Sequence, residues 1–108
     1  MAERAVHWTA TAKYDLSAII DYIAAESPDA ALATLDTLQQ HAASLESLSE
    51  RGRIVPELGD AGLSQYRELM VKPWRILYLP GTDAVHVVAV LDSRRDLQTL
   101  LLERLMRS

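Results

Sequence analysis

The sequence predicts a small α+β fold in which an N-terminal strand and a helical hairpin pack on a small antiparallel sheet, followed by a C-terminal helix. Three observations support this fold class. Two amphipathic segments are joined at Ser27-Pro28, three β-rich segments follow with short turns between them, and residues 94–107 return to a helical pattern. The length of 108 residues predicts one domain that covers residues 1–108.

The first half of the chain predicts one strand and two helices. Residues 3–8 alternate as a short strand does, with Val6 and Trp8 on one face. A helix is expected to end before Pro28, because proline disfavours a helical residue before it, and Pro28 suits the first turn of the next helix. Apolar side chains recur at helical spacing in both segments: they are Ala12, Leu16, Ile19, Ile20 and Ile23, then Ala31, Leu35, Leu38, Ala42 and Leu45, with Lys13, Asp15 and Asp21 off the first stripe.

The second half predicts a run of antiparallel strands. A short strand at Ile54–Val55 is cut by Pro56, and residues 59–62 have the composition of a loop. Residues 66–71, 74–79 and 85–91 are rich in β-forming residues, and the turns between them are short enough for hairpins. Residues 85–91 are apolar at nearly every position except His86, which predicts a strand covered on both faces.

Residues 94–107 predict a helix with more apolar surface than its own fold needs. Six apolar side chains spread over roughly 240° of the helical wheel, whereas an ordinary surface helix uses little more than about 100°. We therefore expect a partner chain to cover this helix, with complete burial inside the fold as the alternative. The expected contacts are Leu97, Leu101 and Leu105; Leu100, Leu102 and Met106 complete the apolar set.

Composition excludes several classes of protein. The net charge is −4 and cysteine is absent, so we expect neither disulfides nor sequence-specific nucleic-acid binding by this chain alone. No segment has the length and hydropathy of a membrane span, and the first residues lack the apolar core of a secretory signal. The sequence thus predicts a cytoplasmic protein. Acidic residues dominate positions 1–50 and basic ones slightly dominate positions 51–108, which indicates two surfaces of different charge.

Motifs for catalysis are absent from the sequence. It contains no Gly-rich phosphate loop and no nucleophile elbow. His7, His41 and His86 lie in three separate segments, so we expect no zinc site, no other metal and no cofactor, and we interpret His86 as an edge or hydrogen-bonded histidine.

A basic group with an aromatic neighbour remains as the candidate binding site. It consists of Arg75, Arg94 and Arg95, with Trp74 near them. The guanidinium group of arginine can donate two parallel hydrogen bonds to a phosphate or a carboxylate of a target. The alternative is ion pairing within the chain, of Arg67 or Arg75 with one of three carboxylates: Glu57, Glu68 or Asp92.

The order of these segments resembles the RelE/ParE superfamily of toxins, most closely its ParE branch, over essentially the whole chain. The matching pieces are Asp15-Leu16, Ile19-Ile20, Tyr22-Ile23-Ala24, Ser27-Pro28-Asp29-Ala30-Ala31, residues 52–58, Tyr66-Arg67-Glu68-Leu69, residues 74–78 and residues 87–96. The resemblance implies the toxin of a type II toxin–antitoxin pair, neutralised by an antitoxin whose C-terminal tail wraps around it.

Three functions stay open under this resemblance. ParE-like toxins inhibit DNA gyrase, whereas RelE-like relatives cut messenger RNA in the ribosome; a non-toxic plasmid- or chromosome-maintenance protein that keeps only its antitoxin is the third. A nuclease would use Arg75, Arg94 and Arg95 around the scissile phosphate, but arginine is a poor proton acceptor. No aromatic residue follows Tyr78 and no histidine follows His86, whereas the nuclease branch usually carries one near its C-terminus. We therefore expect a gyrase inhibitor that acts by binding, rather than an enzyme.

Overall fold

The computed structural model describes residues 4–107, except for the side chains of residues 101, 102 and 105–107. The strands are β1 (Ala5–Trp8), β2 (Arg53–Ile54), β3 (Arg67–Val71), β4 (Trp74–Pro80) and β5 (Ala84–Asp92). The helices are α1 (Ala10–Ala24), α2 (Pro28–Ala43), α3 (Pro56–Asp60) and α4 (Leu97–Arg107), with a 3-10 turn at Ser44–Glu46.

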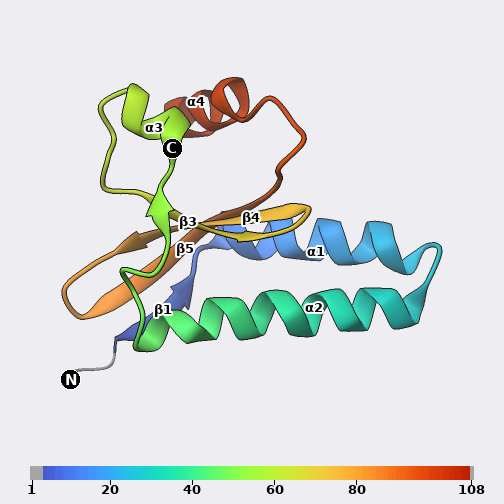
Figure 1. The fold of residues 1–108 in the computed structure, drawn as a ribbon. Coiled ribbons are helices and arrows are strands. Elements are labelled where there is room, and N and C mark those ends of the chain that lie inside the picture. Colours follow the sequence, from blue (N-terminus) through green and yellow to red (C-terminus); the bar gives the residue numbers. More distant parts are fainter. Residues whose placement is uncertain (1–3, 108) are drawn as a thin grey trace.

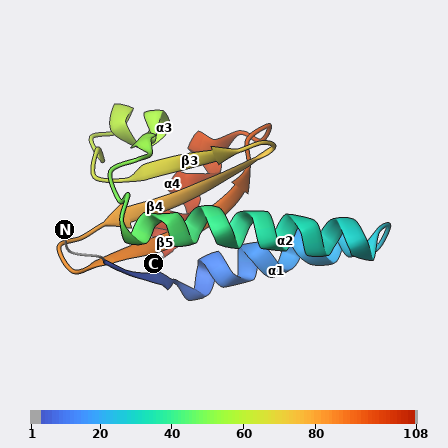
Figure 2. The same cartoon turned by 60° about the horizontal axis from the view of Figure 1, so that its bottom comes forward.

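The described residues form three layers around one five-stranded sheet. The strand order is β1-β5-β4-β3-β2. The hairpin of α1 and α2 lies against one face, and α3 and α4 lie on the other (Figures 1 and 2). The α+β fold with a helical hairpin, a sheet and a C-terminal helix is confirmed. Within residues 4–107, no helix is both long enough and apolar enough to cross a membrane.

The helical hairpin forms as its capping residues indicate. The Thr9 side chain accepts a hydrogen bond of 3.1 Å from the Ala12 N–H, and the Ser27 side chain accepts one of 3.1 Å from the Ala30 N–H. These side chains satisfy backbone donors that the first helical turn leaves without partners. Pro28 occupies the first turn of α2, so the expected boundary between the helices is confirmed.

The apolar stripes of both helices pack on the sheet and make the first core. Ala12, Leu38 and Leu45 are fully buried, and Leu16 and Ile19 pack against the same cluster. Ala42 of α2 belongs to this cluster too, and the sheet supplies its other members from β3, β4 and β5: Leu69, Ile76, Tyr78, Val85, Val87 and Val90.

β5 is an inner strand of the sheet, as its apolar sequence indicates. It pairs antiparallel with β4 on one side and parallel with β1 on the other. Hairpin turns predict only antiparallel neighbours, so the parallel pairing of β1 was not expected from the sequence. The long stretch of chain between β1 and β5, which begins with α1 and α2, satisfies the need of parallel neighbours for a long connection. The sheet is therefore mixed rather than purely antiparallel.

A second core on the other face corrects the first half of the expected loop at residues 59–62. Residues 56–60 form α3, with Pro56 in its first turn and Leu58 buried, whereas residues 61 and 62 form a turn. The Gly-rich sequence suggested a loop, but tertiary packing of Leu58 against Val55, Leu77 and Leu97 favours the helix. Among the boundaries that differ, β2 covers Arg53–Ile54 rather than residues 54–55, and α4 begins at Leu97 rather than at residue 94.

Candidate functional site

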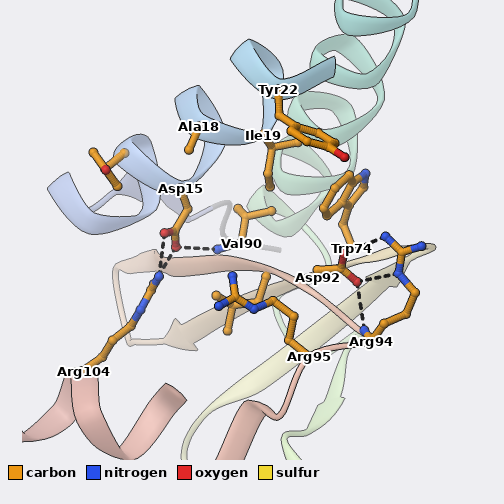
Figure 3. A pocket seen from close by; sticks show the side chains of 12 residues that line it. Asp15, Ala18, Ile19, Tyr22, Trp74, Val90, Asp92, Arg94, Arg95 and Arg104 are labelled. Carbon is orange, nitrogen blue, oxygen red and sulfur yellow. Dashed lines mark hydrogen bonds and ion pairs between the residues drawn. The ribbon is translucent and has the colours of Figure 1, made fainter. Parts of the chain in front are cut away.

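A groove lies where β5 extends beyond the end of β1. β1 pairs with residues 84–87 of β5, whereas β5 continues to Asp92. The groove has a volume of about 420 Å³ and runs between α1, the end of β5 and α4 (Figure 3). We call it the β5-edge groove. Its walls are Tyr14, Asp15, Ala18, Ile19 and Tyr22 from α1, Trp74 from β4, residues 90–92 from β5, Arg94 and Arg95 from the following turn, and Arg104 from α4.

Asp15 closes one end of the β5-edge groove from below α1 (Figure 3). Its carboxylate accepts hydrogen bonds from the Val90 backbone N–H at 3.1 Å and from both terminal nitrogens of Arg104 at 2.7 and 2.9 Å. Only 6% of Asp15 is exposed. Because β1 has already ended, Val90 has no strand partner at this edge, and the Asp15 side chain takes the place of one.

The ion pair of Asp15 and Arg104 joins the two helical layers of the fold. Asp15 belongs to α1 on one face of the sheet and Arg104 to α4 on the other. The hydrogen bonds to Asp15 outweigh burial and raise the pKa of Arg104 above its usual value. A buried carboxylate of this kind needs a cationic partner, because desolvation of an unpaired charge is costly.

Arg94 and Asp92 form a second ion pair at the other end of the groove. The Arg94 guanidinium donates to both oxygens of Asp92, at 2.9 Å from Nε and 2.7 Å from Nη2. The Arg94 backbone N–H donates to the same carboxylate at 2.9 Å. The side-chain hydrogen bond from Arg94 is the main reason why the pKa of Asp92 falls from 3.8 to about 2. Arg94 itself stays exposed to solvent, so a partner can still reach it.

Exposed aromatic side chains complete the groove. Tyr14 and Tyr22 are 74% and 80% exposed, and Trp74 is half-buried beside them. Arg95 is exposed as well and makes no ion pair with another of the described residues. Tyr, Trp and Arg are the residue types that dominate the energetics of protein–protein interfaces. The groove thus has the chemistry of a protein-binding surface.

Comparison with known proteins identifies the family. The family model described as the ParE toxin of the type II toxin–antitoxin system parDE matches residues 6–97. The chain belongs to the ParE toxin family. A solved structure described as the chromosomal ParDE toxin–antitoxin system from P. aeruginosa is similar in fold, with a TM-score of 0.70 at 19% identity. The similarity covers 83% of this chain and 96% of that one. The comparison with curated proteins finds no match.

Arg75 does not join the β5-edge groove of this ParE-family toxin. It is 5% exposed and lies on the opposite side of β4 from Trp74, because successive side chains alternate across a strand. Its terminal nitrogens donate to both oxygens of Glu57 at 2.9 and 2.8 Å, and its Nε donates to Glu68. Of the two expected roles, contact with a target and ion pairing within the chain, the structure shows ion pairing.

The Arg75 network ties α3 to the sheet. Glu68 is 1% exposed and also accepts a hydrogen bond of 2.7 Å from Arg53. Burial alone would lower the pKa of Arg75, but the hydrogen bonds to Glu57 and Glu68 outweigh it and raise that pKa. The hydrogen bond from Arg75 likewise lowers the pKa of Glu57. The ion pairs of Arg75 with Glu57 and Glu68 therefore hold β3, β4 and α3 together.

The helix α4 of this toxin is partly buried within its own fold. Leu97, expected as a partner contact, is 3% exposed and belongs to the second core, so it offers almost no surface to a partner. Leu100 packs partly against the same core. The side chains of Leu101 and Leu105, the other expected contacts, lie outside the described residues, as do those of Leu102 and Met106.

Sequence reasoning missed the α1 wall of the groove. Asp15 was expected to lie off the apolar stripe, and nothing in the sequence indicated that it is buried and paired with Arg104. Tyr14, Ala18 and Tyr22 are spaced by four residues, so they share the face of α1 that borders the groove. That regular spacing of two tyrosines along one face of α1 was the signal available in the sequence.

Proposed function

We propose that this chain is a single-domain toxin that binds a cognate antitoxin and, when free, inhibits DNA gyrase in the cytoplasm. The observation that carries the proposal is the β5-edge groove, where exposed Tyr14 and Tyr22 lie beside half-buried Trp74 and exposed Arg94 and Arg95. Membership in the ParE toxin family supports a proteinaceous target and an antitoxin partner.

The antitoxin is proposed to contact the groove and the neighbouring helix α4. The fold of the P. aeruginosa structure, described as a ParDE toxin–antitoxin system, supports a protein partner for this chain. Leu101 and Leu105 stay proposed contacts because of their positions in the apolar sequence of α4. Leu97 is left out of this proposed surface because it is already buried.

The nuclease alternative requires that Arg75, Arg94 and Arg95 converge on one phosphate. Arg75 is buried and engaged by two carboxylates on one side of β4, whereas Arg94 and Arg95 line the groove with Trp74. Neutralisation of Arg75 by Glu57 and Glu68 also removes the positive charge that a phosphorane would need. These contacts favour the gyrase inhibitor.

The target is tested with two assays on the purified toxin. Gyrase supercoiling should be inhibited, and ribosome-dependent cleavage of messenger RNA should not occur. Arg95→Glu, which reverses the charge of an exposed groove residue, should weaken inhibition about tenfold, as expected for the loss of an interface contact worth roughly 1.4 kcal/mol. Cleavage without any effect on gyrase would overturn the proposal. Normal growth on expression without an antitoxin would favour the non-toxic maintenance protein.

The antitoxin surface is tested by binding measurements with matched controls. Tyr22→Ser in the groove should weaken antitoxin affinity, whereas Leu32→Ser should not, because Leu32 is also exposed, at 66%, but does not line the groove. The double variant Leu101→Asp and Leu105→Asp should also weaken binding, with Gln98→Asp, at an exposed position of α4, as the control for added charge. Unchanged affinity of the Leu101 and Leu105 variant would remove α4 from the proposed interface.

A further inference from the structure

His7 and His86 come from the first and last strands of the chain and meet in the sheet. β1 pairs with β5 in parallel, and the register places His7 directly opposite His86. The ring centroids are 5.5 Å apart and the ring planes are inclined by 34°. The sequence separates the two histidines widely, so only strand pairing reveals that they are neighbours.

Both imidazoles are accessible to an ion from solvent. His7 and His86 are exposed, and they point away from α1 and α2 because the alternating residues Val6, Trp8, Val85 and Val87 pack toward those helices. The third histidine differs: a ring nitrogen of His41 lies 2.9 Å from the Thr37 carbonyl oxygen. No such bond joins the His7 or His86 ring to another of the described residues.

The spacing of the rings fits coordination of one ion. A histidine nitrogen binds Zn²⁺ at about 2.0–2.1 Å, so two imidazoles on one tetrahedral ion have centroids about 5 Å apart. The observed 5.5 Å differs from that value by an amount that small side-chain rotations at an exposed site can remove. We propose that His7 and His86 bind a divalent transition-metal ion through one imidazole nitrogen each, with water in the other positions.

The donor set defines the class of ion. Imidazole suits Zn²⁺, Ni²⁺ and Cu²⁺, whereas Mg²⁺ and Ca²⁺ prefer oxygen ligands. Within residues 4–107, no group of three or more His, Asp or Glu side chains is arranged to hold a metal, so the site is open and has two protein ligands. Affinity is expected to be highest for Cu²⁺. Because the two histidines meet only after folding, the ion links β1 to β5 and stabilises the folded state.

The proposal is tested on the full chain without a polyhistidine tag. CuCl₂, NiCl₂ and ZnCl₂ are titrated by calorimetry, and the thermal unfolding midpoint is followed in parallel, with MgCl₂ as the negative control. The midpoint should rise most with Cu²⁺ and should not change with Mg²⁺. His7→Gln and His86→Gln should each weaken Cu²⁺ affinity about tenfold or more, whereas His41→Gln should leave it unchanged.

Two results would overturn the proposal of a metal site at His7 and His86. One is wild-type affinity in either the His7→Gln or the His86→Gln variant; the other is an equal loss in His41→Gln. Nuclear magnetic resonance of the unsubstituted protein gives an independent readout that does not depend on whether variants fold. Ni²⁺ should broaden the imidazole signals of His7 and His86 before that of His41, and uniform broadening of all three would contradict the proposal. None of these outcomes depends on gyrase or on the antitoxin.

Discussion

Replacement of Asp15 by alanine should lower the free energy of unfolding by about 3–4 kcal/mol. Asp15 is 6% exposed, and its carboxylate accepts hydrogen bonds from two partners, the Val90 backbone N–H and the Arg104 guanidinium. The substitution therefore leaves a cation without its anion and a sheet-edge donor without an acceptor. Both losses act at the junction of α1, β5 and α4.

The magnitude follows from the burial of each partner. Removal of one member of a buried ion pair costs roughly 3–5 kcal/mol when the other cannot reach water. The Arg104 side chain is 29% exposed, so water can partly solvate it after the substitution. The loss of the ion pair should therefore cost no more than the low end of that range. The unsatisfied Val90 N–H adds about 1 kcal/mol. Asp15→Asn keeps an oxygen for Val90 but loses the charge, so about 2 kcal/mol is expected.

Urea unfolding of four proteins tests this prediction. They are the wild type, Asp15→Ala, Arg104→Ala and the double variant, with Asp21→Asn as a control because Asp21 is exposed on the same helix. The control should change stability by less than about 0.5 kcal/mol. The coupling energy between Asp15 and Arg104 should be about 2 kcal/mol. Additive effects within about 0.5 kcal/mol, or an Asp15→Ala cost below about 1 kcal/mol, would refute the reasoning.

Three further predictions concern other parts of the fold. Because the pKa of Asp92 falls from 3.8 to about 2 in the folded protein, its contact with Arg94 should stabilise the protein above about pH 4. That contribution should be lost as the pH falls toward 2. Titration of the Asp92 carboxyl group by nuclear magnetic resonance should give a pKa of about 2, and Arg94→Gln should return the pKa of Asp92 toward 3.8. Gly52→Ala should destabilise the protein by about 2–3 kcal/mol in urea unfolding, because a Cβ there would lie 2.3 Å from the Glu68 carbonyl oxygen and 2.7 Å from the Tyr78 hydroxyl. Gly59→Ala, whose Cβ would meet only a methyl of the exposed Ile54 at 3.3 Å, should change stability by less than about 1 kcal/mol, and equal effects at both glycines would contradict the steric argument. Arg75→Met should cost about 3 kcal/mol of stability, because it leaves Glu68 buried with one fewer partner. At a temperature where the variant is folded, it should inhibit gyrase as strongly as the wild type does. A loss of inhibition in the folded variant would show that Arg75 contacts the target.

The sequence by itself determined the elements whose signals are local. The three- and four-residue spacing of apolar side chains in α1 and α2, the hydroxyl caps at Thr9 and Ser27, and Pro28 between the helices all act within a few residues. The same holds for the apolar run of β5 and for the hairpin turns around β4. These features limit the fold to a helical hairpin on a sheet, and the order of the segments indicated the family.

Only the tertiary structure decided which side chains meet. Periodicity records which face of an element is apolar, but it contains no information on which distant segment covers that face. Asp15 departs from the apolar stripe of α1, yet it is buried because β1 ends early and leaves the Val90 N–H to be satisfied. Arg75 and Arg94 are both basic and flank the same strands in sequence, yet pairing with Glu57 and Glu68 withdraws Arg75 from the groove. Such pairings depend on long-range contacts that form only when the whole chain is packed, and local sequence patterns cannot encode them.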